Sequence, residues 1–342
     1  MKKIFVTGGT GFIGSHLIRE LVKQNYRVKA LIRKNSNLQF ISGYNIDKVV
    51  GDLRNLKIIV NAMQDCDTVI HTAAMARDWG REKDFYDINV KGTKNILKAI
   101  KKNNIKALIH LSTNAVLGEE DCMKPKDENA PYNCKYPYFL SNFWESDMNH
   151  YRCSKMVAEK ETISFCRKNG INLAVLRPVW VYGPREFHSG PYYFCEYILG
   201  GIRLLQGKRT NKFHVIYVKD LVRIIKKVFE KQPEGINIYN IGSDYVPTMD
   251  EFWRLFCKYL NVKPPIYLPK FLTYSIGLAM EASFKIFRSK ESPDLTRARV
   301  AMGYDNNIYD VSKIHREFEF KETPLDKGIK TTVRWWRRNG FL

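Results

Sequence analysis

The chain has 342 residues, enough for one large α/β domain with a smaller appended lobe, or for two domains. Its 44% of hydrophobic and 13% of aromatic residues suit a packed globular protein and argue against disorder. The formal net charge of +21 would attract nucleic acid, anionic membrane surfaces or phosphorylated small molecules. Because the basic residues are spread along the chain and no nucleic-acid-binding motif is present, we expect no nucleic-acid partner and interpret the charge as a solvated, lysine-rich surface.

A glycine-rich turn follows the first apolar run. Residues 3–6 have β propensity, residues 7–14 read TGGTGFIG, and a helical pattern continues through Leu17, Ile18 and Leu21. A strand, a glycine turn and a helix in this order form the context that a dinucleotide-binding loop requires. The glycines allow a tight turn, close approach of the backbone to a pyrophosphate and close packing of helix on strand, while the helix directs its free N–H groups at the phosphates.

Strand and helix patterns alternate through the first half of the chain. The expected strands cover residues 27–32, 68–71, 107–111 and 171–176, and the expected helices cover 89–101 and 151–169. This alternation predicts an α/β fold with a Rossmann-type doubly wound parallel sheet. The first strand begins at Lys2 and leaves no room for a signal or transit peptide, so we expect a cytoplasmic protein.

The regular pattern breaks later in the chain. Prolines, acids and aromatics crowd residues 118–150, which we interpret as a long functional loop or lid. We expect residues 1–184 to form the dinucleotide-binding domain and residues 185–342 mainly a smaller substrate-binding lobe. The segments near 213–222 and 236–243 are expected to return to the main domain.

The cysteines and histidines show no metal-binding spacing. The seven cysteines are odd in number and form no CxxC pair, so without a secretion signal we expect free thiols rather than disulfides or metal ligands. The seven histidines form no HExxH or HxxxH cluster. We therefore expect no metal site.

A tyrosine and a lysine lie four residues apart at the start of an expected helix. This spacing places Tyr151 and Lys155 on one helical face, one turn apart. A nearby ammonium favours the phenolate form of a tyrosine, which can then exchange a proton with an alcohol or a developing alkoxide. The YxxxK pattern alone is weak because surface helices produce it freely.

Other motifs accompany the YxxxK pattern, and with them the chain resembles the extended short-chain dehydrogenase/reductases of the NAD-dependent epimerase/dehydratase superfamily. The motifs that carry the resemblance are GGTGFIG at 8–14, GDL at 51–53, HTAA at 71–74, NVKGT at 89–93, LSTNAVLG at 111–118, YRCSK at 151–155, and RP at 177–178 with VYGP at 181–184. The motifs follow one another in the family's order, and the resemblance covers nearly the whole length of the chain. The C-terminal third resembles, loosely, the 3β-hydroxysteroid dehydrogenase and dihydroflavonol reductase branch.

The resemblance implies a nicotinamide cofactor and a set of residues around it. The implied cofactor-binding residues are Gly8, Gly11, Phe12, Ile13, Gly14, Asp52, Leu53, Thr72, Ala73, Ala74, Lys155, Pro178 and Val181, and the implied catalytic residues are Thr113, Tyr151, Lys155 and Asn89. Tyr151 would be the acid/base, Lys155 would assist it and hold the nicotinamide ribose, and Thr113 would bind the substrate oxygen. Ser112 is interpreted as structural, and Cys153 as a bystander that faces away on the helix.

Two departures from the family pattern narrow the prediction. The second strand ends in Arg33 and Lys34, where an acid would bind the ribose 2′-hydroxyl of NAD; the two cations suit a 2′-phosphate, so NADP is favoured over NAD. The family's 4,6-dehydratases place Asp-Glu after the catalytic threonine, whereas this chain has Asn114 and Ala115. Neither side chain can serve as a carboxyl acid/base, so dehydration is disfavoured.

The sequence leaves the substrate open. The leading hypothesis is an NAD(P)-dependent oxidoreductase acting on a secondary alcohol or ketone, with an apolar substrate as one candidate; the alternative is a nucleoside-diphosphate-sugar epimerase with a tightly held nucleotide. A non-catalytic, cofactor-sensing protein would not need the set of Thr113, Tyr151 and Lys155.

Two possible contacts complete the sequence-based predictions. Residues 271–287 are apolar and aromatic, with Glu281 and Lys285 as a favourable helical pair, and could line a pocket, pack in the lobe or rest on a membrane surface. The resemblance also suggests a homodimer formed through the helices 91–101 and 151–169.

Overall fold

The computed structural model describes residues 2–118, 121–122, 124–136, 138, 140–141, 144–187, 190–287, 289 and 291–342. A seven-stranded sheet forms its centre, with the strand order β10-β6-β5-β4-β1-β2-β3, and every pairing in it is parallel. The strands are β1 (Lys3–Thr7), β2 (Arg27–Ile32), β3 (Asp47–Val50), β4 (Thr68–His71), β5 (Ala107–Leu111), β6 (Asn172–Pro178) and β10 (Ile236–Ile241). The predicted Rossmann-type fold is confirmed.

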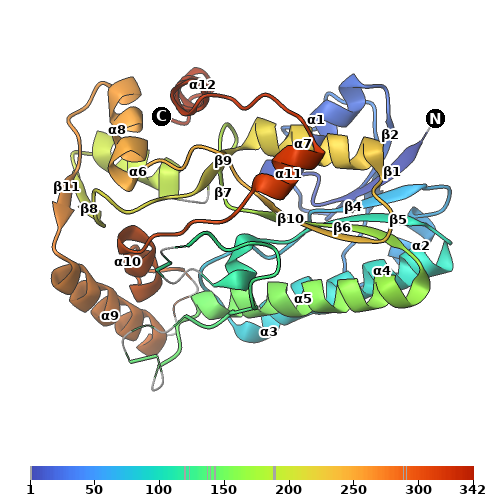
Figure 1. Ribbon diagram of the computed structural model, residues 1–342, viewed down its shortest axis with the longest axis horizontal. Coiled ribbons are helices and arrows are strands. Elements are labelled where there is room, and N and C mark those ends of the chain that lie inside the picture. The colour runs from blue at the N-terminus through green and yellow to red at the C-terminus, as the bar shows by residue number, and fades with distance from the viewer. Residues whose placement is uncertain are drawn as a thin grey trace.

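Helices cover both faces of this sheet (Figure 1). On one face lie α1 (Phe12–Lys23), α7 (Val218–Lys231) and α11 (Ser312–Glu317); on the other lie α2 (Leu56–Ala62), α4 (Gly92–Lys102) and α5 (Met148–Asn169). Side chains alternate along a strand, so Ile4 and Val6 of β1 pack under α1 and α7 while Phe5 packs under α2 and α4. Both faces are therefore apolar, as a buried parallel sheet requires.

A smaller lobe lies beyond the carboxyl end of the sheet, at the left of Figure 1. It contains the strand pairs β7 (Trp180–Tyr182) with β9 (Val215–Tyr217) and β8 (Leu204–Gln206) with β11 (Ile266–Leu268), and the helices α6 (Gly190–Leu199), α8 (Met249–Leu260), α9 (Lys270–Ile286), α10 (Arg297–Tyr304) and α12 (Leu325–Arg338). An aromatic core that includes Phe252, Trp253, Phe256 and Trp336 holds α6, α8 and α12 together.

The two segments expected to return to the main domain behave differently. β10 completes the main sheet beside β6, as expected. β9 instead pairs with β7, although Ile216 and Leu221 of the same segment reach the core beneath α1. The placement of a domain boundary at residue 184 stays a prediction.

Several element boundaries differ from those expected. β2 and β5 have the predicted bounds, whereas α5 begins three residues early, at Met148. The helix expected at 89–101 is divided between a π-helical segment, η1 (Tyr86–Lys91), and the α-helix α4, which begins at Gly92. A short helix, α3 (Glu82–Phe85), precedes η1. Single turns of π-helix occur frequently at functional sites.

Candidate active site

The glycine loop joins β1 to α1 with no room for side chains. Gly8 has φ +73°, and a Cβ placed there would lie 2.7 Å from the backbone nitrogen of Ala73 at the end of β4. A Cβ on Gly14 would lie 2.1 Å from the Gly8 carbonyl oxygen. The two glycines therefore let the loop close against both the neighbouring strand and its own helix.

The first turn of α1 is open to a ligand. Gly11, the N-cap residue, is exposed and makes no side-chain cap, and the first turn contains no acidic residue. The backbone N–H groups and the positive end of the helix dipole are thus available to an anion. Phe12 and Ile13 are half-buried here and pack toward the aromatic core of the lobe.

A pocket of about 600 Å³ lies at the carboxyl ends of β2 and β3. It is lined by Arg33, Lys34, Asn35, Val50, Gly51, Asp52 and Ile58. Arg33 and Lys34 are exposed, so the pocket carries positive charge at its edge. The three residues predicted here from the sequence, Arg33, Lys34 and Asp52, do lie together.

Asp52 already has a partner in this pocket. Arg54 donates from Nε and Nη2 to the two carboxylate oxygens of Asp52, at 2.7 and 2.9 Å, and these hydrogen bonds hold the pKa of the aspartate below its usual value. The neighbouring Leu53 is buried against Gly92 at the start of α4, and its carbonyl accepts from Asn95 Nδ2.

The end of β4 is fixed to the end of β1 by a chain of hydrogen bonds. Thr72 Oγ1 donates to the Thr7 carbonyl at 2.7 Å, and the Ala73 N–H donates to Thr7 Oγ1 at 3.3 Å. Ala74 follows, half-buried. The predicted residues 72–74 therefore lie directly beside the glycine loop.

His71 beneath this chain is neutral and takes one tautomer. Thr93 Oγ1 donates to the Asn89 carbonyl, so it must accept from His71 Nε2; His71 Nδ1 then accepts from Thr7 Oγ1. Burial, with Lys155 nearby, lowers the pKa of His71 to about 3. We therefore assign His71 a structural role in holding the two strand ends.

Asn89 connects two parts of the site. It lies in η1, where its Oδ1 accepts from the Met75 N–H at 2.7 Å and its Nδ2 donates to Ser154 Oγ at 2.9 Å. Ser154 Oγ in turn donates to the Tyr151 carbonyl at 2.8 Å. Asn89 thus links the segment after β4 to the turn of α5 that contains Tyr151 and Lys155.

Lys155 reaches from α5 to the end of β5. Its side chain is buried, and its Nζ donates to the Leu111 carbonyl at 2.7 Å. Burial lowers the pKa of this amine to about 8, although Glu159 opposes the shift. Thr113, two residues beyond Leu111, is buried as the N-cap of a short 3₁₀ helix, η2 (Asn114–Leu117), and its Oγ1 accepts from the Ala115 N–H.

The structure therefore brings most of the predicted residues to one edge of the sheet. Because the strands are parallel, their carboxyl ends, at Thr7, Ile32, His71, Leu111 and Pro178, lie along the same edge. Pro178 is buried there, and Val181 is half-buried in β7 between the two cores. The catalytic roles of Thr113, Tyr151, Lys155 and Asn89 stay predictions.

A buried charged cluster beside this site was missed by the sequence analysis. Glu159 and Arg177 are fully buried and paired, with Arg177 Nη2 2.6 Å from Glu159 Oε1. Tyr132 OH donates to the same carboxylate at 2.7 Å, and Ser112 Oγ donates to its other oxygen. Ser112 therefore has a partner in the buried cluster, and its structural role stays a prediction. The sequence did offer one sign of the cluster, because Glu159 follows Lys155 by four residues on the same helical face.

The prediction that all seven cysteines are free thiols was wrong. Cys134 and Cys153 form a disulfide, with Cα atoms 4.9 Å apart. Cys153 lies between Tyr151 and Lys155 on α5, so the bridge ties the loop 118–147 to the proposed catalytic turn. The other five cysteines are free.

Opening this disulfide is expected to lower the free energy of unfolding by about 3 kcal/mol, because the bridge closes a loop of 19 residues in the unfolded chain. Urea unfolding with and without a reductant measures the difference. The Cys134→Ser variant should have the same free energy of unfolding as the reduced parent protein, with or without reductant. The Cys122→Ser variant should lose stability on reduction by the same amount as the parent. Equal stability of the parent protein in both conditions would contradict the expectation.

The loop that carries Cys134 is also fastened to the C-terminal lobe. Lys285 of α9 lies 2.8 Å from Asp147, Arg297 Nη2 of α10 donates to the Trp144 carbonyl at 2.8 Å, and Tyr136 OH donates to Asp305. The described part of 118–147 contains no α-helix and only a single β-bridge, at Lys126, consistent with the predicted loop.

The expected pair between Glu281 and Lys285 was wrong. Glu281 points inward and is buried against Arg297, whose Nη2 lies 2.8 Å from Glu281 Oε2. Lys285 turns instead to Asp147. A buried carboxylate needs a close cation, and Arg297 supplies one from a neighbouring helix.

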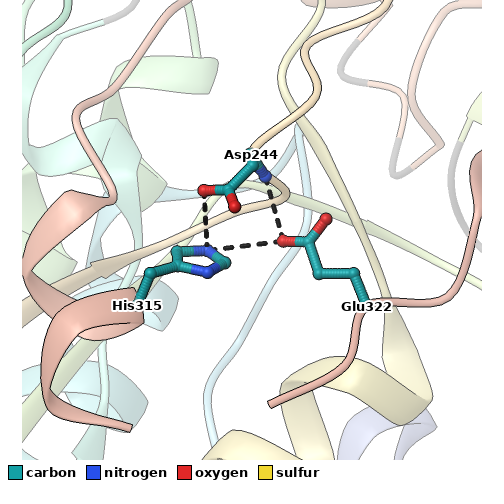
Figure 2. A group of neighbouring side chains, drawn as sticks. All are labelled: Asp244, His315 and Glu322. Atoms are coloured by element: carbon teal, nitrogen blue, oxygen red, sulfur yellow. Dashed lines mark hydrogen bonds and ion pairs between the residues drawn. The ribbon is translucent and has the colours of Figure 1, made fainter. Parts of the chain in front are cut away.

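One group of side chains has donor atoms of the types that metals accept. Figure 2 shows Asp244, after β10, facing His315 on α11 and Glu322 beyond it. His315 Nε2 lies 3.3 Å from Asp244 Oδ1, from Glu322 Oε1 and from the Gly242 carbonyl. Three acceptors around one nitrogen require that it carry a hydrogen, so the geometry is that of a hydrogen-bonded cluster that joins α11 to the segment after β10. The absence of a metal stays a prediction.

Among the described residues, no helix combines the length and the apolar composition needed to cross a bilayer.

The glycine loop, the open helix N-terminus and the pocket at the carboxyl edge of the sheet together define a nucleotide-dependent α/β enzyme with a Rossmann-type fold. Residues 4–242 match the model of the NAD dependent epimerase/dehydratase family, and the chain belongs to this family. The resemblance drawn from its motifs is confirmed.

The chain is similar to known proteins and to solved structures over most of its length and of theirs. The chain is 26% identical to a 2-alkyl-3-oxoalkanoate reductase of Shewanella oneidensis, over 95% of this chain and 84% of that protein. It is 25% identical to a decarboxylating sterol-4-alpha-carboxylate 3-dehydrogenase of Schizosaccharomyces pombe, over 96% and 95%. Its fold matches the crystal structure of a UDP-glucose 4-epimerase of Thermotoga maritima with a TM-score of 0.76 and 23% identity, over 98% of this chain and 99% of that one.

Proposed function

We propose that the protein is an NADP-dependent oxidoreductase that interconverts a secondary alcohol and a ketone. The observation that carries the proposal is the arrangement at one edge of the sheet: a glycine loop that excludes side chains, an open helix N-terminus, and a buried lysine at the end of β5. The two curated relatives described above, a reductase and a dehydrogenase, support this reaction class.

The residues present fit a dinucleotide. Gly8 and Gly14 keep the loop free of side chains, the N–H groups of α1 suit the pyrophosphate, and the pocket with Arg33 and Lys34 suits the adenosine end. Lys155 would hold the nicotinamide ribose. When bound, the nicotinamide would donate or accept the hydride.

The chain's own groups would position and protonate the substrate. Thr113 would donate a hydrogen bond to the substrate oxygen, and Tyr151 would give that oxygen a proton or take one from it. A cation one helical turn from Tyr151 favours the phenolate form, and Lys155 occupies that position. The hydrogen bond from Lys155 to Leu111, close to Thr113 in the chain, supports this grouping because it ties α5 to the segment that carries the threonine.

NADP is proposed over NAD because of Arg33 and Lys34. Replacing both with serine is expected to raise the Kd for NADPH about tenfold or more, since two charge-assisted contacts to a 2′-phosphate would be lost, while the Kd for NADH changes little. Isothermal titration with both nucleotides measures this, with Lys48→Ser on the exposed strand β3 as a control cation. Equal weakening for both nucleotides would reject the NADP assignment.

A sugar-nucleotide epimerase is the second candidate, because the family contains both reaction types. The two differ in how they use the nucleotide. An oxidoreductase consumes one NADPH for each product molecule that it forms. An epimerase retains its nucleotide, which undergoes no net oxidation or reduction while the sugar is converted. Two measurements distinguish the candidates. The purified protein is first analysed for bound nucleotide, and it is then incubated with panels of ketones and nucleotide sugars while the absorbance of NADPH is followed.

Three further predictions from the sequence stay proposals. The first is a homodimer through α4 and α5, which lie side by side on one face of the sheet (Figure 1) and are joined by Lys94 and Glu161 at 3.0 Å. The others are a cytoplasmic location and a C-terminal lobe that binds the substrate.

A further inference from the structure

The exposed apolar side chains of the protein are concentrated in the C-terminal lobe. Of the fourteen large hydrophobic residues that are exposed among those described, eleven lie in residues 193–204 and 266–287. The most exposed are Phe287 at 82%, Phe271 at 75% and Ile286 at 71%. A monomeric protein rarely leaves so many apolar side chains together in water, so this concentration indicates a binding surface.

The helix α9 within this region turns its charged side toward the protein. Glu281 is buried against Arg297, and Lys285 is paired with Asp147. The exposed residues of α9 are Phe271, Leu272, Ser275, Ile276, Ala279 and Ile286, together with Lys270 at its first position. Apart from Lys270, the outward face is therefore uncharged, the reverse of an ordinary surface helix.

The two segments form one surface. β8 pairs with β11, so the exposed Leu204 and Ile266 are register partners on the same side of a two-stranded sheet. β11 leads directly into α9, and Phe271 follows within its first turn. In Figure 1 these elements lie at one extremity of the molecule, opposite the N-terminus. We call the surface made by Leu204, Ile266, Phe271, Ile276, Ile286 and Phe287 the apolar patch.

Cations border the apolar patch. Residues 193–209 and 258–287 expose five cations and one acid: Lys208, Arg209, Lys258, Lys263 and Lys270 against Glu196. Lys258 is paired with Asp326, and Lys270 lies 3.6 Å from Asp305. Lys208, Arg209 and Lys263 flank the paired strands, and Arg209 stacks on Tyr267 of β11. The side of the patch at β8 and β11 is thus positive, in keeping with the net charge of +21, whereas the exposed acids Glu291 and Asp294 follow its other end.

We propose that the apolar patch docks the protein on an anionic membrane surface. Phe271 lies at the start of α9 and Phe287 just past its end, so the whole helix would lie flat, with its uncharged face among the acyl chains and the bordering cations at the lipid phosphates. The charge complementarity favours an acidic lipid surface over a second copy of a chain that is itself strongly basic. The proposal is independent of the proposed reaction.

Vesicle sedimentation tests the proposal. The protein should bind phosphatidylcholine vesicles that contain phosphatidylglycerol and bind pure phosphatidylcholine vesicles much less, and salt should weaken the binding. The triple variant Phe271→Ser/Ile286→Ser/Phe287→Ser should bind at least about tenfold less, because three apolar anchors are lost. Tyr245→Ser, which removes an exposed aromatic outside the patch, should bind like the parent.

The outcomes separate the possible occupants. Unchanged vesicle binding by the triple variant, equal binding to both kinds of vesicle, or no binding at all would overturn the proposal. A concentration-dependent dimer in sedimentation velocity that the triple variant abolishes would also overturn it, in favour of a second copy. Thermal melting and NADPH titration of the triple variant check that its fold and nucleotide site are intact, and neither readout depends on turnover.

Discussion

Replacing Tyr151 with phenylalanine is expected to lower kcat by about two to four orders of magnitude, the range typical of a lost general acid or base. The change removes only the hydroxyl, and Tyr151 is half-buried at the start of α5, so the fold should be unaffected. The Kd for NADPH should stay within about twofold, because the phosphate and adenosine contacts lie elsewhere. Steady-state kinetics and isothermal titration on the same preparation measure both quantities.

A tyrosine outside the site provides the matched control. Tyr193 on α6 is 40% exposed, and Tyr193→Phe should leave kcat unchanged. If Tyr151→Phe kept most of the turnover, the acid/base assignment would be wrong. If it lost nucleotide binding as well, the loss of activity would report damage to the site rather than lost proton transfer.

Alanine at two glycines of the loop should give two different failures. Gly14→Ala places a methyl group 2.1 Å from the Gly8 carbonyl, so the start of α1 must move away from the loop; we expect a loss of about 3 kcal/mol in stability and no detectable nucleotide binding. Gly11→Ala meets its nearest atom only at 3.3 Å and is exposed, so the fold should tolerate it. Its methyl group would instead stand in the approach of the pyrophosphate and raise the Kd for NADPH about tenfold or more.

Thermal melting and isothermal titration distinguish the two effects. Gly43→Ala serves as the control, since no atom lies within 4 Å of its Cβ position and its φ is not left-handed. Unchanged nucleotide affinity in Gly11→Ala would show that the dinucleotide does not pass this loop. A fully stable Gly14→Ala would show that the loop and α1 have room for a methyl group at this position.

The sequence predicted the fold well where apolar periodicity is strong. β2 and β5 have the expected bounds because each is a short, mainly apolar run between turn signals. The π-helical segment η1 was missed because its composition is that of an ordinary helix. The pairing of β9 with β7 was not predicted, because a three-residue apolar strand does not reveal which neighbour it pairs with.

The candidate site was predictable only where it follows local motifs. The glycine loop and the turn with Tyr151 and Lys155 are each continuous in sequence. The buried cluster of Glu159, Arg177 and Tyr132 joins three distant segments, and no single segment signals it. The disulfide was missed for a related reason: the loop that brings Cys134 to Cys153 has no periodic pattern, so the approach of the two residues exists only in the folded chain.

The position of the disulfide gives the protein a built-in chemical reporter. Of the five unbridged cysteines, four are buried and only Cys122 is partly accessible, so a chromogenic thiol reagent should titrate one group per native chain. Cys134 and Cys153 are both half-buried, and opening their bridge would raise the count to three. A colorimetric assay could therefore tell, in a single undenatured sample, whether the segment ahead of α5 is anchored to the turn that carries Tyr151.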